Sequence, residues 1–132
     1  MKSIRIMVAV MIVGSGLAVS LAQAQKPEIS RAELTHRDFG DSVREVIQTR
    51  VDFGPGAAFP RHSHPGVEVA YVLEGSLEYQ LDDKPPVTLK AGDSLFIPAG
   101  TIHSARNAGS GKASELATYV VEKGKPLVVA AP

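Results

Sequence analysis

The chain contains no cysteine and no tryptophan, and its 14 basic residues are balanced by 14 acidic ones. Without cysteine there is no disulfide framework, no thiolate zinc or iron–sulfur site and no cysteine nucleophile. The even charge balance, with no basic cluster, argues against a nucleic-acid surface. A metal ion in this protein would have to be held by histidine, carboxylate or water. At 132 residues, of which 44% are hydrophobic, the chain is long enough for one compact domain.

The first 24 residues have the pattern of a secretory signal peptide. Lys2 and Arg5 precede an uncharged run over residues 6–21, and Ala22 and Ala24 occupy the small-residue positions of a cleavage site. The run is 16 residues long. An uncleaved anchor is the alternative, but a membrane span needs roughly 20 apolar residues. We expect cleavage after Ala24, export to the periplasm or to the outside, and no stable membrane anchor.

The remaining sequence divides into an N-terminal segment over residues 25–42 and a barrel domain over residues 43–127. In the segment, residues 25–30 are interpreted as a flexible tether and residues 30–39 as the one plausible helical stretch. Nine prolines and twelve glycines punctuate the chain, and alternating runs predict strands over residues 43–53, 67–73, 77–81, 87–89, 94–97, 102–106 and 115–121. Short strands at near-regular spacing are typical of an antiparallel all-β sandwich or barrel.

Two of the four histidines, His62 and His64, are separated by a single residue. Residues i and i+2 of a strand face the same side, so both imidazoles can face one cation. Glu68 has the same parity beyond a Pro-Gly bend, and His103 follows from a separate predicted strand. Three imidazoles and one carboxylate form a ligand set suited to a divalent transition metal. Taken alone, the histidine pair is equally compatible with a structural or surface role.

These residues belong to a longer pattern of ten positions: Gly56, His62, His64, Glu68 and Gly75, followed by Gly92, Pro98, Gly100, His103 and Asn107. The pattern resembles both conserved motifs of the cupin superfamily. The short segment between its two halves resembles small single-domain bacterial cupins with the type-2 conserved barrel. The resemblance implies an antiparallel double-stranded β-helix, or jelly-roll barrel, that binds a metal through His62, His64, Glu68 and His103. It also implies a homodimer.

The ligand set and the resemblance together predict a metal-dependent function. Fe or Mn is favoured, with Zn, Ni and Cu as alternatives. Four protein ligands leave two positions of an octahedral ion open to a small-molecule ligand, and Glu68 is the one ligand able to accept a proton. We expect an enzyme, dioxygenase-like or a lyase or isomerase, that acts on a small oxygen-rich organic molecule with Glu68 as catalytic base. A non-catalytic metal-binding or ligand-sensing module is the alternative, because a fold does not determine a function.

The other candidate residues are expected to have structural or surface roles. His36 lies outside both motifs and is expected to be exposed and not a ligand. Tyr71 and Tyr79 are expected to pack, with a role in a pocket as the alternative. Ala70 and Val72 share the parity of Glu68 and predict a small apolar wall beside the metal. No further aspartate or glutamate is expected to act as an independent general base.

Overall fold

The computed structural model describes residues 28–40 and 43–132, and all regular secondary structure in these ranges is β-strand. In chain order the strands are β1 (Ile29–Asp38), β2 (Arg44–Phe53), β3 (Ala58–Ser63), β4 (Gly66–Glu74), β5 (Ser76–Leu81), β6 (Val87–Lys90), β7 (Ser94–Ile97), β8 (His103–Arg106), β9 (Ala113–Glu122) and β10 (Val129–Ala130). Within the described ranges there is no helix that is long and apolar enough to cross a membrane. The predicted signal peptide, residues 1–24, and residues 25–27 of the predicted tether lie outside them.

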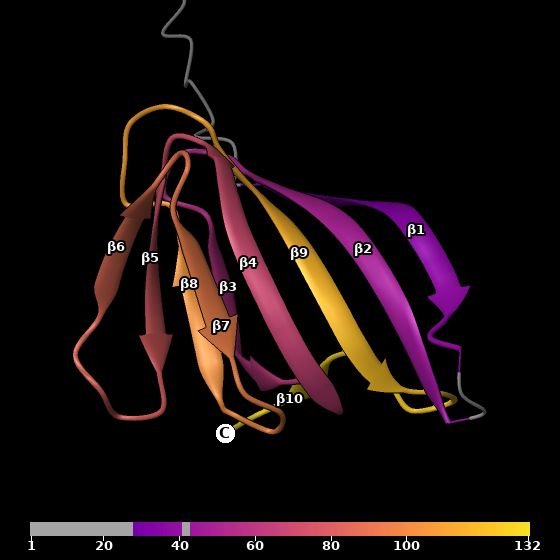
Figure 1. Cartoon of the computed structure of the whole chain (residues 1–132). Coiled ribbons are helices and arrows are strands. Elements are labelled where there is room, and N and C mark those ends of the chain that lie inside the picture. Colours follow the sequence, from indigo (N-terminus) through magenta and orange to yellow (C-terminus); the bar gives the residue numbers. More distant parts are fainter. Residues whose placement is uncertain (1–27, 41–42) are drawn as a thin grey trace, which may run out of the picture.

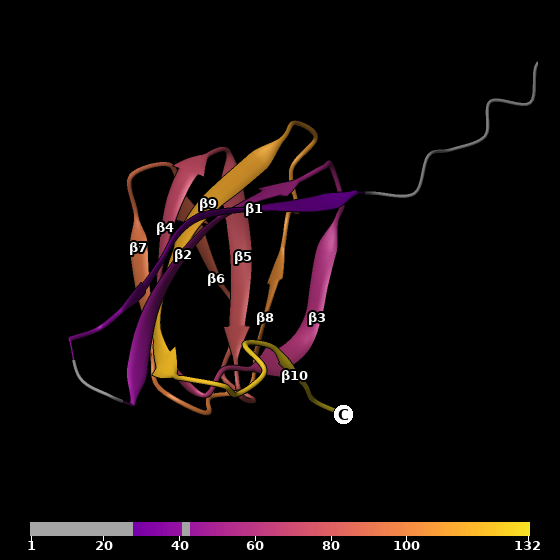
Figure 2. The same ribbon diagram turned by 90° about the vertical axis from the view of Figure 1, so that its right-hand side faces the viewer.

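The strands form two five-stranded sheets, in the orders β1-β2-β9-β4-β7 and β10-β3-β8-β5-β6 (Figures 1 and 2). Each hydrogen-bonded pair of strands is antiparallel. From β2 to β5 the chain changes sheet at every step, so strands that follow one another in sequence lie in opposite layers. This is the predicted jelly-roll architecture, and each of the seven predicted strands is present with small shifts at its ends.

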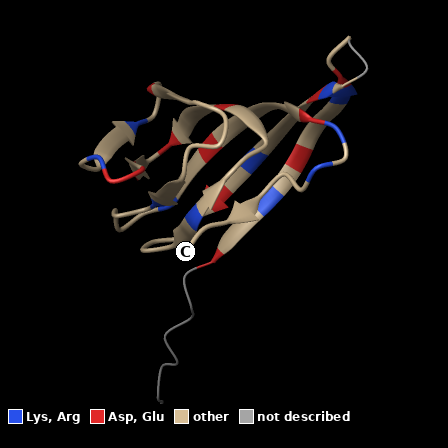
Figure 3. Ribbon diagram, turned by 90° about the horizontal axis from the view of Figure 1, so that it is seen from below, with Lys and Arg blue, Asp and Glu red and all other residues tan. Residues whose placement is uncertain are grey.

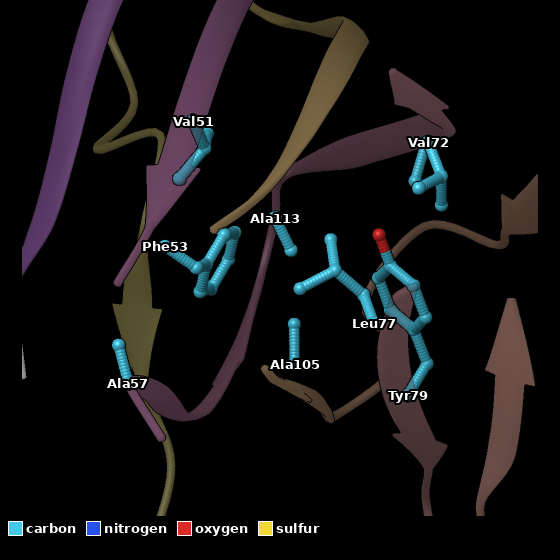
Figure 4. Packing of buried hydrophobic residues seen from close by; sticks show 9 residues of the cluster. Val51, Phe53, Ala57, Val72, Leu77, Tyr79, Ala105 and Ala113 are labelled. Carbon is cyan, nitrogen blue, oxygen red and sulfur yellow. The ribbon is translucent and has the colours of Figure 1, made fainter. Parts of the chain in front are cut away.

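Side chains from both sheets fill the interior. Figure 4 shows Phe53 of β2 and Leu77 of β5 pointing toward one another, with Ala105 and Ala113 between the layers. Leu77 is completely buried and Phe53 is 1% exposed. Alternation along each strand explains this packing, because every second residue faces inward.

A one-residue connection carries the chain from one layer to the other between β4 and β5. Gly75 makes this connection with a φ of +68°. A Cβ at this position would lie 2.5 Å from the carbonyl oxygen of Lys112, so both the backbone conformation and the lack of space require glycine.

Asn107, the last residue of the ten-position pattern, forms hydrogen bonds to several backbone segments at one end of the barrel. Its buried Nδ2 donates to the carbonyl oxygens of Phe53, Gly54 and Gly111 at 3.2, 3.1 and 2.8 Å, and its Oδ1 accepts from the amide of Gly109 at 3.0 Å. The asparagine thereby satisfies backbone groups that these irregular segments leave unpaired.

The helical prediction for residues 30–39 is wrong. These residues form most of β1, an edge strand that pairs with β2 from Ile29↔Phe53 to Asp38↔Glu45. Eight of the ten residues of β1 are exposed, so the strand lacks the apolar alternation by which buried strands are recognised. The predicted flexible tether is wrong at its C-terminal end, because Ile29 and Ser30 already belong to this strand.

Charged residues of both signs are interspersed along the long strands (Figure 3). Examples are the Arg50–Asp52 pair, with Nε and Oδ1 2.9 Å apart, and the Lys123–Asp38 pair, with Nζ and Oδ1 2.8 Å apart. Such solvent-accessible pairs contribute little to stability, so the burial between the sheets holds the fold.

Candidate metal centre

Three strands and one loop bring the four predicted ligands together. His62 lies on β3 and is paired directly with His103 at the start of the neighbouring strand β8. His64 follows the end of β3, and Glu68 reaches the group from β4 in the opposite sheet. The exposed fractions are 6% for His62 and 3% for each of the other three, so the group is shielded from water.

The three imidazoles form a compact cluster. One ring nitrogen from each lies within 4.8 Å of the others. The ring centroids are separated by 4.2 Å for His62–His103, 4.8 Å for His62–His64 and 5.1 Å for His64–His103. Such spacing allows three nitrogens to surround one small cation.

Each imidazole is oriented by a backbone carbonyl. The Nδ1 atoms of His62 and His103 lie 2.8 and 2.9 Å from the carbonyl oxygens two residues earlier in the chain, and Nδ1 of His64 lies 2.6 Å from that of Leu127. A carbonyl oxygen only accepts, so each Nδ1 is the donor and each Nε2 presents its lone pair. This outer hydrogen bonding is typical of metal-binding histidines.

Glu68 adds a carboxylate to the same space. Its Oε2 is 3.0 Å from Nε2 of His64 and 3.1 Å from Nε2 of His103. Buried Nε2 of His64 and Oε2 of Glu68 receive no hydrogen bond within the protein. With hydrogens on the Nδ1 atoms, lone pairs of nitrogen and oxygen face each other, which is unfavourable unless a proton or a cation lies between them. The donor set therefore fits a divalent transition metal.

Burial and the neighbouring charged groups together set the pKa values within the cluster. Burial lowers the pKa of His62 to about 4, so this imidazole is neutral at physiological pH. Burial opposes a charge on Glu68, but the imidazoles of His103 and His64 outweigh it and lower the Glu68 pKa to about 2. Burial also opposes a charge on His103, yet Glu68 prevails and raises the pKa of His103. Without metal, a proton on His103 relieves part of the repulsion, and a cation would displace it.

A small cavity of about 10 Å³ adjoins the cluster, which is room for about one water molecule. It is lined by His62, His103, Glu68, Glu115, Tyr79, Tyr119 and Arg31, together with Val51, Phe53, Phe59 and Ala105. Ala70 and Val72, the predicted apolar wall, are completely buried on the same strand as Glu68.

Sequence reasoning missed Glu115. This β9 residue is 5% exposed and lines the same cavity as Glu68. The expectation that no further carboxyl acts as an independent general base stays a prediction. It accepts a short hydrogen bond from the Tyr79 hydroxyl. Burial, together with the negative charge of Glu68, raises the pKa of Glu115 to about 7. The available signal was strand alternation, since Glu115 shares the inward parity of Ala117 and Tyr119.

The remaining candidates behave differently from one another. Tyr79 is buried and lines the cavity, whereas Tyr71 is 43% exposed. His36 is exposed as predicted and lies outside the imidazole cluster, with its Nε2 2.8 Å from Oε2 of Glu45. Arg31 also lines the cavity and was not recognised, because its strand was predicted to be a helix.

Comparison with known proteins agrees with this geometry. A family model described as a cupin domain matches residues 49–126 of the chain. Germin-like protein subfamily 2 member 2 of Arabidopsis thaliana is 36% identical over 88 residues, covering 61% of this chain and 39% of that protein. The chain thus spans well under half the length of this relative.

Two solved structures share the architecture. Oxalate oxidase in complex with the substrate analogue glycolate has a TM-score of 0.63 and 26% identity, covering 79% of this chain and 55% of the other. The DMSP lyase DddQ from Ruegeria pomeroyi DSS-3 has a TM-score of 0.59 and 26% identity, covering 65% and 43%. One is an oxidase and the other a lyase, so the shared architecture does not select a reaction.

The buried Glu115 carboxyl predicts a pH-dependent stability. Its pKa is about 7 in the native state against an ordinary value of 4.5, so the native state binds more protons between these values. Its stabilising contribution is complete below pH 4.5 and is lost as the pH rises through 7. In metal-free protein, Glu115→Gln, which keeps an acceptor for Tyr79, should gain on the order of 1–3 kcal/mol over wild type between pH 5 and pH 8.

Urea unfolding at several pH values measures this difference. Glu74→Gln, at an exposed position, is the matched control and should follow the wild-type profile. Parallel profiles for wild type and Glu115→Gln would contradict the prediction.

Proposed function

This chain belongs to the cupin domain family, and on that premise we propose that it is a metal-dependent enzyme acting on a small oxygen-rich organic molecule. One observation carries the proposal. Nε2 of His64 and Oε2 of Glu68 are buried 3.0 Å apart and no hydrogen bond satisfies them. An arrangement of this kind costs stability unless an ion compensates it, so its presence supports a functional site.

The proposed ligands are His62, His64, His103 and Glu68. Imidazole nitrogen and carboxylate oxygen suit Fe or Mn, with Zn, Ni and Cu as alternatives. When bound, such an ion supplies Lewis acidity and, in the case of Fe or Mn, one-electron chemistry.

The protein's own residues then have distinct tasks. The three backbone carbonyls that accept from Nδ1 hold the imidazoles in one tautomer. Glu68 is the proposed catalytic base: with Oε2 facing the imidazoles, its other carboxylate oxygen, Oε1, would accept a proton from a hydroxyl or enol of the bound molecule. Buried apolar neighbours such as Val51 and Phe53 limit the access of water to the cavity.

Dioxygenase-like oxidation and lyase or isomerase chemistry are both compatible with a carboxylate base beside a metal. The oxalate oxidase and DMSP lyase neighbours support one of these classes each. A binding or sensing module would use the same ligands without turnover, so an assay for turnover separates it from the enzyme.

The ligand assignment predicts how metal content responds to substitution. Wild type should hold about one ion per chain after loading with Mn²⁺ or Zn²⁺. His103→Ala should lower the affinity by more than about 10- to 100-fold, because a direct ligand contributes at least as much as its hydrogen-bonding partners. His36→Ala removes an exposed histidine and should bind as wild type does. Elemental analysis after gel filtration measures the content, and full occupancy in His103→Ala would contradict the assignment.

The role of Glu68 predicts a loss of turnover that exceeds the loss of metal. Oxygen uptake and product formation are measured with Fe- or Mn-loaded protein and a panel of oxalate, diketones, flavonols and catechols. At saturating metal, Glu68→Gln should lower turnover about 10²- to 10⁴-fold, since a positioned base contributes that much. Full activity in this variant would end the proposal for Glu68. Metal-loaded wild type without turnover on any compound would favour the binding module.

We also propose export and homodimer formation. The signal-peptide pattern over residues 1–24 supports export, because it combines a basic start, an uncharged run and a small-residue cleavage site. The intact mass of protein from its native host should correspond to a chain beginning at Gln25, and a retained Met1 would contradict cleavage.

Sedimentation of the same sample should give a dimer mass, whereas a monomer mass at micromolar concentration would exclude a stable homodimer.

A further inference from the structure

The N-terminal edge strand β1 places a positively charged side chain, that of Arg31, at the cavity. Arg31 pairs with Val51 of β2, and Val51 pairs with Glu115 of β9. Residues directly opposite each other on neighbouring strands point to the same face of a sheet. Because Val51 and Glu115 are buried, Arg31 also faces the interior and reaches the cavity beside the imidazole cluster.

The guanidinium of Arg31 uses little of its binding capacity. Its Nη2 donates to the Tyr119 hydroxyl at 3.3 Å, and its Cζ lies 5.6 Å from the centroid of the Phe59 ring. Among the described residues, no carboxylate lies within ion-pair distance of Arg31. Arginine has five N–H donors in a planar fork, so the donors that suit a carboxylate are available to a ligand.

Two aromatic residues, Tyr119 and Phe59, each contact both Arg31 and one imidazole of the cluster. The Tyr119 ring, whose hydroxyl accepts from Arg31, lies 4.7 Å from the His64 ring, and the Phe59 ring lies 4.6 Å from the His62 ring. Arg31, His62 and His103 line the same cavity, so a small molecule held there can face the guanidinium at one end and the imidazoles at the other.

The charges of the cavity favour an anion. A divalent ion together with the guanidinium leaves the cavity positive even when Glu68 and Glu115 are both ionised. An anionic group entering such a half-buried site is attracted more strongly than it would be in water.

We infer that the cavity takes a small carboxylate, whose carboxylate group is bound by the guanidinium of Arg31 while its other end reaches the imidazole cluster. This inference rests on the proposed metal-dependent function and names its substrate class. Arg31 is the exposed member of the cavity lining, and one side-chain hydrogen bond of 3.3 Å holds its guanidinium. Its side chain can therefore move outward and enlarge a cavity that has room for about one water molecule.

The competing explanation is that Arg31 serves only the protein itself. Its charge acts to lower the pKa values of Glu115 and Tyr119 against the effect of burial. A purely internal role of this kind would leave the choice between a charged and an uncharged ligand unaffected by substitution of Arg31.

The test compares glycolate with glycolamide, a pair of similar size that differs in charge. The protein, loaded with redox-inert Zn²⁺, is titrated with each compound in a calorimeter at neutral pH. Wild type should bind glycolate at least about 10-fold more tightly than glycolamide, since charge-assisted bidentate hydrogen bonds are the strong ones. Arg31→Gln should lose about 10- to 100-fold in glycolate affinity and little in glycolamide affinity. Arg31→Lys should recover part of the preference, because lysine keeps the charge without the fork.

Arg37→Gln is the matched control and should retain the wild-type preference. Arg37 lies on the same strand and donates to the backbone carbonyl of His36, away from the cavity lining. The zinc content of every variant is measured in the same samples.

Each result is decisive. If Arg31→Gln holds zinc and keeps the preference for glycolate, or if wild type shows no such preference, the inference is overturned while the metal centre stands. If wild type holds neither Zn²⁺ nor Mn²⁺ after loading, the proposed function fails. The comparison is then made on metal-free protein, where a preference that depends on Arg31 supports the anion site and its absence overturns it.

Discussion

The hydrogen bonds between three histidine Nδ1 atoms and three backbone carbonyls are the constraint on which the site depends. Two of these carbonyls lie two residues before their histidines, and the third belongs to Leu127 near the C-terminus. Because they determine the tautomers, all three Nε2 atoms present lone pairs to a common point. Without them the imidazoles could rotate or exchange tautomers, and a proton would satisfy the cluster as well as a metal.

Burying this centre lowers the stability of the fold, and the packing and hydrogen bonds around it offset that loss. Four ionisable side chains are buried together, with exposed fractions of 6% or less. The two apolar clusters of the interior each contribute a tyrosine to this region: Tyr119 lies against His64, and Tyr79 donates to Glu115. The tyrosines connect the apolar packing to the polar centre, so the two are not independent parts of the molecule.

Local sequence signals were sufficient for most of the strands, and the ten-position pattern for the four proposed ligands. Residues 43–53 and 115–121 alternate between apolar and polar side chains because one face of each strand packs on the other sheet, and both were predicted as strands. His62 and His64 were recognised by their spacing, and His103 and Asn107 by the second half of the pattern. The edge strand β1 was not recognised, because its side chains are mostly exposed and its stability comes from backbone pairing with β2.

The sequence by itself determined the class of fold and the four side chains proposed to hold a metal. These depend on the alternation of apolar and polar residues and on the spacing of the ten-position pattern, both of which can be read along the chain. Only the tertiary structure decided that Glu115, Arg31 and the Leu127 carbonyl join that centre. Their places follow from strand register and from the packing of one sheet on the other, and such contacts between distant residues leave no periodic signal in the sequence.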